Sequence, residues 1–552
     1  MRCAARSSAF GELAELEIAC AKTPRNSWEL GELRLSRMVL LHAILAYSGS
    51  ADVSGPAPTP NKSAVKYYGE SHGYVNALDG GRIDHRGEYF ELVSPLTLSY
   101  AQVSNRFLPT QNLPTEIVRR FANRTMAITG FENQVTRMDG DREVAVPCSD
   151  LYNHHWNLFF ASSKAPFSEV ERRLQWGHPG LGAAAPPRAP PGATVPLRQV
   201  FSEGNGNEHR GSFHGTPRGY AQLIDSPATA DFVHMSINTR NPAGHNLDPA
   251  AAPQPRSSTS LLPGAGSGWS GVLECPCTTR RAINYANNSI DGQPFHSRCV
   301  AGGPLARTNN TICTLAGYAA NGGMQCCKDG MVLLDADQPD HPPTTYYHKL
   351  RVYFEDGPPP PRQAPAATAP PQNAFRLYWQ TEEWMGEYNV PQCSTGTPPS
   401  ACVHTLTTTL HAYELFGGLT SPTDDHRLNC SIVTDVWCGD VQAVEAAGGK
   451  FKLLNMAFHQ HSPAVLSGEL YNDETGELIC RNAPIRGATV GAPLDEKGYG
   501  VGIPPCVWGS AAEGLPPPPL LDLRTRLLVI AKYNSSVPHY GVMAMWQGRG
   551  GL

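Results

Sequence analysis

The stretch that decides the fold runs Lys450-Phe-Lys-Leu-Leu-Asn-Met-Ala-Phe-His-Gln-His461. One parity carries the apolar residues Leu454, Met456 and Phe458, and the other carries His459 and His461. Because side chains alternate across a strand, we expect the apolar set to face a core while both imidazoles leave from the opposite face. Two histidines at positions i and i+2 form a clamp found in both zinc and copper sites, so the motif indicates a metal without naming it. An exposed His pair without a metal is the alternative.

The composition favours a mainly β protein with more than one core. The chain has 552 residues, which is too long for one ordinary domain. Gly (53) and Pro (49) are frequent while charged residues make up only 17%, a balance that favours short strands joined by turns over long helices. The net charge of -5 and the lack of a dense basic run argue against a nucleic-acid partner.

Cysteines and glycosylation motifs indicate the secretory pathway. The chain has 15 cysteines. Asn-x-Ser/Thr motifs stand at Asn61, Asn123, Asn287, Asn309, Asn429 and Asn534. Together they predict a disulfide-bonded glycoprotein in an oxidising compartment. Without Cys3 and Cys20, which lie in a presumed leader, 15 − 2 = 13 cysteines remain. At least one of these is then expected to be free or intermolecular.

The amino-terminal region has the order of residues typical of a signal peptide, displaced inward. Arg34 and Arg37 precede an apolar run at 38–47, and small residues follow it. We therefore expect a signal peptide at 38–53, with residues 1–37 an added leader or Met38 the true start. A short core helix is the alternative. No other apolar run is long enough to cross a bilayer, so we expect a secreted, soluble protein without a stable membrane span.

Two segments of the first half carry candidate metal ligands. His154 and His155 run into the hydrophobic segment 156–160. Neighbours on a regular strand point to opposite faces, so two ligands from this pair require a bend or bulge. One buried and one exposed His is the alternative. His234 is expected to leave its strand from the face opposite the more apolar one, in a structural role or as a ligand.

Cysteine spacing and a proline-rich run divide the chain. The segment 357–372 is the best linker, so we expect a first domain at 60–356 and a second at 373–552. Candidate disulfide pairs are Cys393 with Cys402 and Cys480 with Cys506. We also expect disulfides at two further cysteine motifs, the Cys-x-Cys of Cys275 and Cys277 and the adjacent pair Cys326-Cys327. Thiolate ligation of a metal is the alternative.

The second half resembles two groups of known proteins. The segments that carry the resemblance are Phe458-His-Gln-His-Ser462, Leu466–Tyr471, Gly476–Pro484, Gly498–Ile503 with Cys506, and Tyr533–Met543. They are similar to the plant stress up-regulated Nod 19 family. They are also similar to the second copper domain of the type II, ascorbate-dependent copper monooxygenases, the peptidylglycine and dopamine hydroxylases.

The resemblance implies a fold and two ligand sets. The fold is a pair of jelly-roll-like β-sandwich domains with Pro/Gly-rich loops. The first copper would be held by His154, His155 and His234, and the second by His459, His461 and Met543. Met545 is the alternative thioether, and a soft thioether beside imidazoles suits Cu(I).

The function implied is that of a secreted, Nod 19-like copper monooxygenase. It would use ascorbate as electron donor to hydroxylate an unidentified small molecule or peptide. The alternative is a non-catalytic extracellular stress glycoprotein on the same scaffold, with at most one metal site. A zinc hydrolase lacks a convincing general base near His459 and His461.

Overall fold

The computed structural model describes most of the chain after residue 73. The described residues are 2–6, 17–21, 74–167, 195–203, 212–244, 251–256, 270–274, 278–280, 283–284, 289–290, 293–294, 329–358, 371–380, 388–416, 435–459, 461, 464–490 and 495–552. The signal-peptide prediction at 38–53 lies outside them, as do four of the acceptor asparagines, Asn61, Asn287, Asn309 and Asn429, and the cysteines at 275, 277, 326 and 327.

The chain divides into two compact units. Met1–Pro56 form the first, in which β1 (Arg2–Arg6) pairs antiparallel with β2 (Glu17–Ala21). Ala57–Leu552 form the second, which contains all the features described below.

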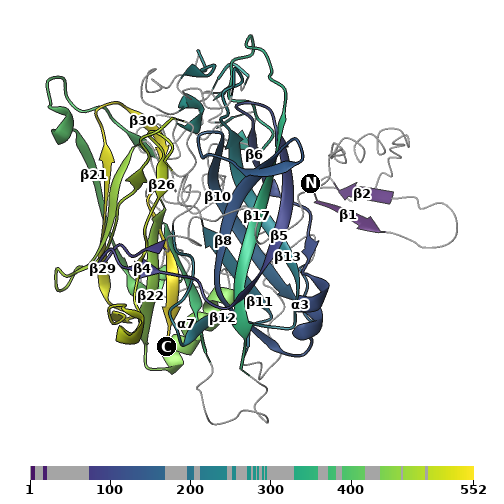
Figure 1. Ribbon diagram of the computed structural model, residues 1–552, viewed down its shortest axis with the longest axis vertical. Helices are drawn as coiled ribbons and strands as arrows, with labels where there is room; N and C mark the ends of the chain where they lie inside the picture. The colour runs from purple at the N-terminus through teal and green to yellow at the C-terminus, as the bar shows by residue number, and fades with distance from the viewer. Residues whose placement is uncertain are drawn as a thin grey trace. The chain divides into compact units, whose positions relative to one another are not determined.

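Two sheets of the second unit form the first β-sandwich (Figure 1). One sheet has the order β11 (Arg198–Glu203), β10 (Leu151–Ser162), β13 (Pro227–Asn238) and β6 (Val103–Phe107), with β7 (Gln111–Asn112) beside β13. The other has the order β18 (Gln372–Asn373), β12 (Tyr220–Asp225), β8 (Thr125–Asp139), β17 (Thr344–Asp356) and β5 (Glu88–Leu98), with β9 (Arg142–Ala145) beside β8. Side chains of both sheets, such as Trp156 and Leu350, meet in one apolar cluster between them. The short helix α3 (Thr115–Arg120) adds Ile117 to that cluster.

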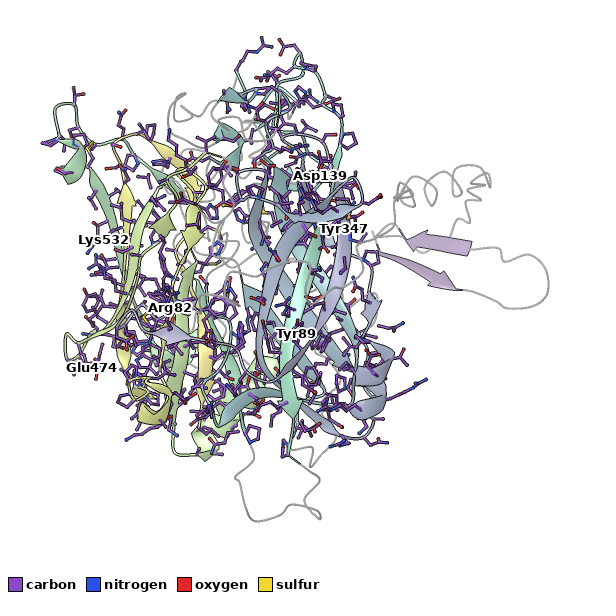
Figure 2. The ribbon with its side chains drawn as sticks, viewed as in Figure 1. Arg82, Tyr89, Asp139, Tyr347, Glu474 and Lys532 are labelled. Atoms are coloured by element: carbon purple, nitrogen blue, oxygen red, sulfur yellow. A yellow bond between two sulfur atoms is a disulfide. The ribbon has the colours of Figure 1, made fainter. Side chains whose placement is uncertain are left out.

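The second sandwich is built in the same way. One sheet has the order β19 (Phe375–Gln380), β31 (Met545–Gly551), β22 (Lys450–His459) and β27 (Cys506–Val507), with β28 (Leu520–Asp522) beside β22. The other has the order β21 (Val403–His411), β29 (Arg526–Asn534), β23 (Val465–Asn472) and β24 (Leu478–Asn482). Along β29 buried residues alternate with more exposed ones, and Lys532 projects from the outer face (Figure 2). The mainly β fold of two sandwiches expected from the sequence is thus confirmed.

Shorter elements complete the second unit. The paired strands are β3 (Tyr74–Val75) with β4 (Arg82–Ile83), β14 (Ile283–Asn284) with β15 (Ser289–Ile290) and β16 (Gln293–Pro294), β20 (Tyr388–Val390) with β30 (His539–Val542), and β25 (Ile485–Arg486) with β26 (Gly500–Gly502). The helical elements are η2 (Gly271–Glu274), η6 (Pro399–Ala401), η7 (Ala412–Leu415), α7 (Asp435–Ala446) and η8 (Ala511–Glu513). A search of the described residues finds no helix with the length and apolar character needed to span a bilayer.

Both disulfides proposed for the second sandwich are present. Cys393 is bonded to Cys402, with their Cα atoms 5.5 Å apart, and Cys480 is bonded to Cys506, with theirs 5.9 Å apart. The second bond joins β24 to β27, which belong to different sheets of the sandwich. It therefore fastens the two layers to each other directly.

The two sandwiches pack against each other through polar and apolar contacts. Asn455 on β22 donates its Nδ2 hydrogen to the carbonyl of Gly215, and Arg549 Nε donates to Gln222 Oε1 over 2.8 Å. The hairpin β3–β4 lies at the same interface, because Asn76 Nδ2 donates to the carbonyl of Val507 over 3.1 Å. The hydroxyl of Tyr74 in the same hairpin donates to the Glu132 carboxylate of β8, so residues 74–83 contact both sandwiches.

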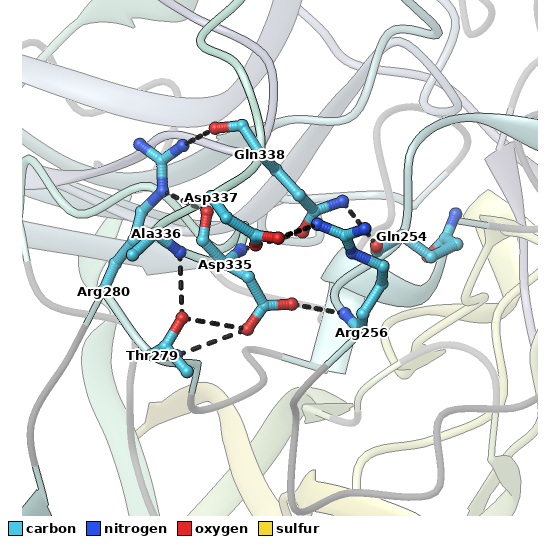
Figure 3. Close-up of polar contacts among 8 residues, drawn as sticks. All are labelled: Gln254, Arg256, Thr279, Arg280, Asp335, Ala336, Asp337 and Gln338. Atoms are coloured by element: carbon cyan, nitrogen blue, oxygen red, sulfur yellow. Dashed lines mark hydrogen bonds and ion pairs between the residues drawn. The ribbon is translucent and has the colours of Figure 1, made fainter.

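Asp335 holds together three loop segments that lie within residues 254–338 (Figure 3). Its carboxylate accepts hydrogen bonds from the backbone N–H of Arg256 and from the Thr279 hydroxyl, the latter over 3.3 Å. Arg280 Nε donates to the Asp335 carbonyl over 2.9 Å. The adjacent Leu333 and Leu334 pack in the same buried cluster as Tyr499 of the second half, so this network braces a loop next to the contact between the sandwiches.

Candidate metal centre

A bulge in β10 turns two adjacent histidines to one face. The pairing with β13 shifts between Asn153 and His155, so His154 is the extra residue. Beyond the bulge Trp156 faces the core of the sandwich, which places its neighbour His155 on the outer face. Since a bulge puts two residues opposite one, His154 can leave from that same outer face. The bulge that the sequence required for this pair is therefore present.

A second bulge and an early strand end place the other histidine pair. In β22 the register shifts between Leu453 and Asn455, so the apolar parity changes there. Alternation predicted that Leu454, Met456 and Phe458 share the core face. Met456 and Phe458 do pack in the core cluster, but Leu453 takes the place expected for Leu454. His459 leaves from the face opposite Phe458, toward the first sandwich. The strand ends at His459, so His461 follows it rather than continuing the strand.

Met543 lies in a break between β30 and β31 and meets His459. β30 ends at Val542 and β31 begins at Met545, so residues 543 and 544 separate the two strands. The Tyr533 hydroxyl donates to the carbonyl of Met543 over 2.6 Å, which holds the break in place. Met543 Sδ lies 3.2 Å from His459 Nε2. Met545 Sδ instead accepts from the Tyr378 hydroxyl over 3.2 Å, so of the two thioethers Met543 is the one at the histidine.

Histidines of the two sandwiches are in contact. The ring centres of His154 and His461 lie 4.2 Å apart, edge to face. The ring centres of His154 and His459 lie 6.0 Å apart, those of His459 and His461 5.4 Å, and those of His154 and His155 5.2 Å. We call His154, His459, His461 and Met543 the interdomain cluster. Each of its members is at most 8% exposed.

The interdomain cluster fits a soft metal ion by the chemistry of its donors. Within the described residues, His154 Nδ1 is buried and lacks a hydrogen-bond partner, which is costly unless a ligand satisfies it. His459 turns its Nε2 toward Met543 Sδ, while its Nδ1 on the other side of the ring is also buried without a partner among those residues. Burial keeps the pKa of both imidazoles well below 6.5, and His461 lowers both pKa values further. Neutral imidazole is the metal-binding form. In the described part of the chain no three His, Cys, Asp or Glu side chains stand as a ready-made metal group. The rings of His154 and His461 touch each other, with centres 4.2 Å apart. An ion would have to rotate them apart.

His234 lies away from the other candidate ligands. It is the cross-strand partner of Trp156, so the two side chains share the interior face of their sheet. Its Nε2 is 2.9 Å from the Ser104 hydroxyl, and its ring centre is 4.9 Å from that of His348 on the facing sheet. His234 shares its face with Phe232, and Met235 and Ile237 pack on the other face, as alternation along the strand predicts. The face that carries His234 is nevertheless the interior of the first sandwich. The structure therefore does not bring His234 together with His154 and His155 on one face.

Two residues that support the site carried no signal in the sequence. His348 packs on His234, and its ring is 3.0 Å from Asn133 Nδ2 and 3.3 Å from the Ser236 hydroxyl. Asn482 Oδ1 accepts the backbone N–H of Phe458 over 2.6 Å and so fixes the chain just before His459. Asn482 stands in a segment that carried the family resemblance, and His348 lies on β17. Neither had a spacing that indicated its partner.

The fold and the site define a protein of two β-sandwiches with a buried His–Met cluster where they meet. No family model matches the chain, and no curated protein matches it. Two solved structures align over most of the chain but with very low similarity. They are a cryo-EM structure of the Sputnik virophage (9% identity, 90% of this chain and 92% of that chain, TM-score 0.18) and the crystal structure of the mavirus major capsid protein (10% identity, 90% and 93%, TM-score 0.19).

Proposed function

We propose that this protein is a secreted copper protein that binds the metal through His459, His461 and Met543. The observation that carries the proposal is the 3.2 Å approach of Met543 Sδ to His459 Nε2 in a buried site. A thioether beside imidazoles favours Cu(I) over harder divalent ions. The two disulfides support an oxidising, extracellular location.

The activity proposed is ascorbate-dependent hydroxylation of an unidentified small molecule or peptide, as in the copper monooxygenases that the second half resembles. Copper supplies one-electron chemistry toward dioxygen, with ascorbate as the source of electrons. The chain's own contribution is to hold neutral imidazoles at a fixed separation and to keep bulk water away, since the cluster is buried. Tyr533 positions the thioether by binding the carbonyl of Met543.

The interior position of His234 favours a second candidate function. A two-copper monooxygenase requires a first copper site, and the structure does not gather His154, His155 and His234 into one. A chain with one complete ligand set fits a non-catalytic extracellular glycoprotein that holds a single copper. Its copper would be bound but would not turn over with ascorbate and oxygen.

Metal analysis of the purified protein tests the copper site. We expect copper after reconstitution in the wild type, its loss in His459→Ala/His461→Ala, and a weakening of at least about tenfold in Met543→Leu. Met545→Leu is the control for the sulfur, because Met545 Sδ accepts from the Tyr378 hydroxyl although Met545 pairs with His459 across the two strands. Copper binding unchanged in the double variant would refute the site.

Repeated turnover separates the two functions. Ascorbate is added to the Cu(II) form, and the electron paramagnetic resonance signal is followed as oxygen is readmitted. The monooxygenase proposal expects the signal to disappear and return over many cycles with continuous consumption of ascorbate. A signal that is lost once, or not at all, supports the non-catalytic candidate.

A further inference from the structure

The interdomain cluster places a donor from the first sandwich within the ligand set of the second. His154 comes from β10, whereas His459 and Met543 come from β22 and the β30–β31 break. The ring centres of His154 and His461 are 4.2 Å apart, whereas those of His459 and His461 are 5.4 Å apart. His461 is therefore closer to the histidine of the other sandwich than to its neighbour in sequence. The resemblance assigns His154 and His461 to different metal ions, and this arrangement does not keep them apart.

We infer that one soft metal ion, Cu(I), is coordinated jointly by His154, His459, His461 and Met543 and so links the two sandwiches. The inference rests on the copper binding proposed above and adds a fourth donor to it. His155, although adjacent, and His234, on the interior face, are not part of this set.

The separations agree with one shared ion. Imidazoles on one tetrahedral ion, with metal–nitrogen distances of about 2.0–2.1 Å, have ring centres roughly 5 Å apart. The three ring separations among His154, His459 and His461 are 4.2, 5.4 and 6.0 Å and bracket that value. Only the His154–His461 contact is too close, and a modest rotation of these two rings opens it.

Burial and orphaned nitrogens supply a second, independent reason. His154 is 2% exposed, and its Nδ1 has no hydrogen-bond partner within the described residues. A structural explanation for a buried imidazole normally includes a partner for each nitrogen, as Ser236 and Asn133 provide for His348. His154 lacks such a partner at Nδ1, and the nearest groups to its ring are other imidazoles and Tyr152.

A fourth protein donor has a consequence for function. Structural metal sites are closed by four protein ligands, whereas catalytic sites keep one position open for water or substrate. Coordination by His154 closes the set, so the ion acts as a cross-link between the sandwiches. Displacement of His154 would open a position while the other three donors remain.

Copper titration of the full chain tests the shared site. Cu(I) is added to the reduced, metal-free protein in competition with a chelator, and stoichiometry and affinity are measured. We expect one ion per chain in the wild type and an affinity lowered about tenfold or more in His154→Ala, similar to the loss in Met543→Leu. His404→Ala, which removes a half-buried histidine of β21 outside the cluster, is the matched control and should bind as the wild type does.

X-ray absorption provides a readout that protein stability alone does not change. The wild type should show three imidazoles and one sulfur around copper, and His154→Gln should show two imidazoles with the sulfur retained. Copper should also raise the Tm of the wild type more than that of His154→Gln, because an ion that joins two domains opposes their separation. Circular dichroism confirms that the variants are folded.

The outcomes separate this inference from the copper proposal. Two ions per chain, with the His154 variants losing one and leaving the affinity of the other unchanged, would overturn the shared site and leave copper binding by the second sandwich intact. A single ion whose affinity and imidazole count do not respond to His154 would overturn it as well. No copper in the wild type would overturn both.

Discussion

At the scale of single residues, the site depends on imidazoles that are kept neutral by burial. His348 shows the effect most simply, because burial alone lowers its pKa to about 3. Asn133 and Ser236 offer hydrogen-bonding groups to both of its nitrogens, so the neutral ring is satisfied where it lies. The neighbouring His234 has its pKa lowered by burial and by His348. The protonated form of either ring would be unpaired in the core of the first sandwich.

This arrangement predicts that the metal-free protein loses stability in mild acid. A His whose folded pKa is depressed stays neutral in the folded state while the unfolded chain takes up a proton below about pH 6.5, so the free energy of unfolding falls as the pH falls. For His348 the loss between pH 7.5 and pH 5 is about 2 kcal/mol. Urea unfolding of the wild type and of His348→Gln at both pH values measures it. His348→Gln should have a lower free energy of unfolding than the wild type at pH 7.5. Its free energy of unfolding should then fall by about 2 kcal/mol less than that of the wild type between pH 7.5 and pH 5.

A control residue makes the comparison sharp. His404 on β21 is only partly buried, and burial lowers its pKa less completely than that of the core histidines. His404→Gln should therefore reduce the pH dependence by less than His348→Gln does. Equal pH dependence in the wild type and His348→Gln would mean that the ring is not held neutral.

At the scale of elements, the two disulfides of the second sandwich should contribute unequally. Cys480 and Cys506 are 26 residues apart and Cys393 and Cys402 are 9 apart. Because loop closure restrains the unfolded chain more for the longer loop, Cys480→Ala/Cys506→Ala should lower the free energy of unfolding by about 3–4 kcal/mol, and Cys393→Ala/Cys402→Ala by about 2–3 kcal/mol. Urea unfolding of the two double variants tests the order. The reverse order would show that native-state packing, not loop closure, dominates.

The elements also show which parts of the site could be predicted. The bulge at His154 followed from the requirement that adjacent histidines share a face, and the choice of Met543 over Met545 followed from the resemblance. Nothing in the sequence required the bulge beside Leu454. It places the residues before it on the opposite faces from those that simple alternation predicts. Alternation places His234 with Phe232 on one parity of β13, but it does not identify that face as the interior, because apolar residues occupy both parities.

At the scale of the whole molecule, contacts between the sandwiches were beyond the reach of sequence patterns. The approach of His154 to His461 joins positions about 300 residues apart, and no local periodicity encodes how two sheets dock. The mainly β class followed from local alternation and turn composition, and the pair of sandwiches followed from the family resemblance.

The secretory location proposed above predicts a glycan on the first sandwich. Asn123 is exposed in a left-handed turn (φ 55°) after α3, and Thr125 completes its acceptor motif. Protein secreted from eukaryotic cells should therefore carry a glycan there, which peptide mapping before and after glycosidase detects. Asn123→Gln should remove that mass increment and leave secretion of a folded protein unchanged. An unmodified Asn123 in secreted material would contradict the prediction.

The packing of the sandwiches predicts that they unfold as one unit, and Arg549 is the residue that tests it. Its Nε donates to Gln222 of the first sandwich over 2.8 Å, its guanidinium lies 5.5 Å from the ring centre of Phe131, and the side chain is buried. Arg549→Ala removes a charge-assisted hydrogen bond and leaves a gap in the interface, at an expected loss of about 2–4 kcal/mol. Arg526→Ala, which breaks an exposed ion pair with Asp473, should cost less than about 1 kcal/mol.

Circular dichroism and tryptophan fluorescence followed in urea should coincide in the wild type and in Arg526→Ala, because a shared interface makes the transition cooperative. In Arg549→Ala the two transitions should separate or move together to lower urea. A variant as stable as the wild type would mean that the sandwiches are held together chiefly by the apolar contacts of Tyr74, Phe213, Val507 and Leu515.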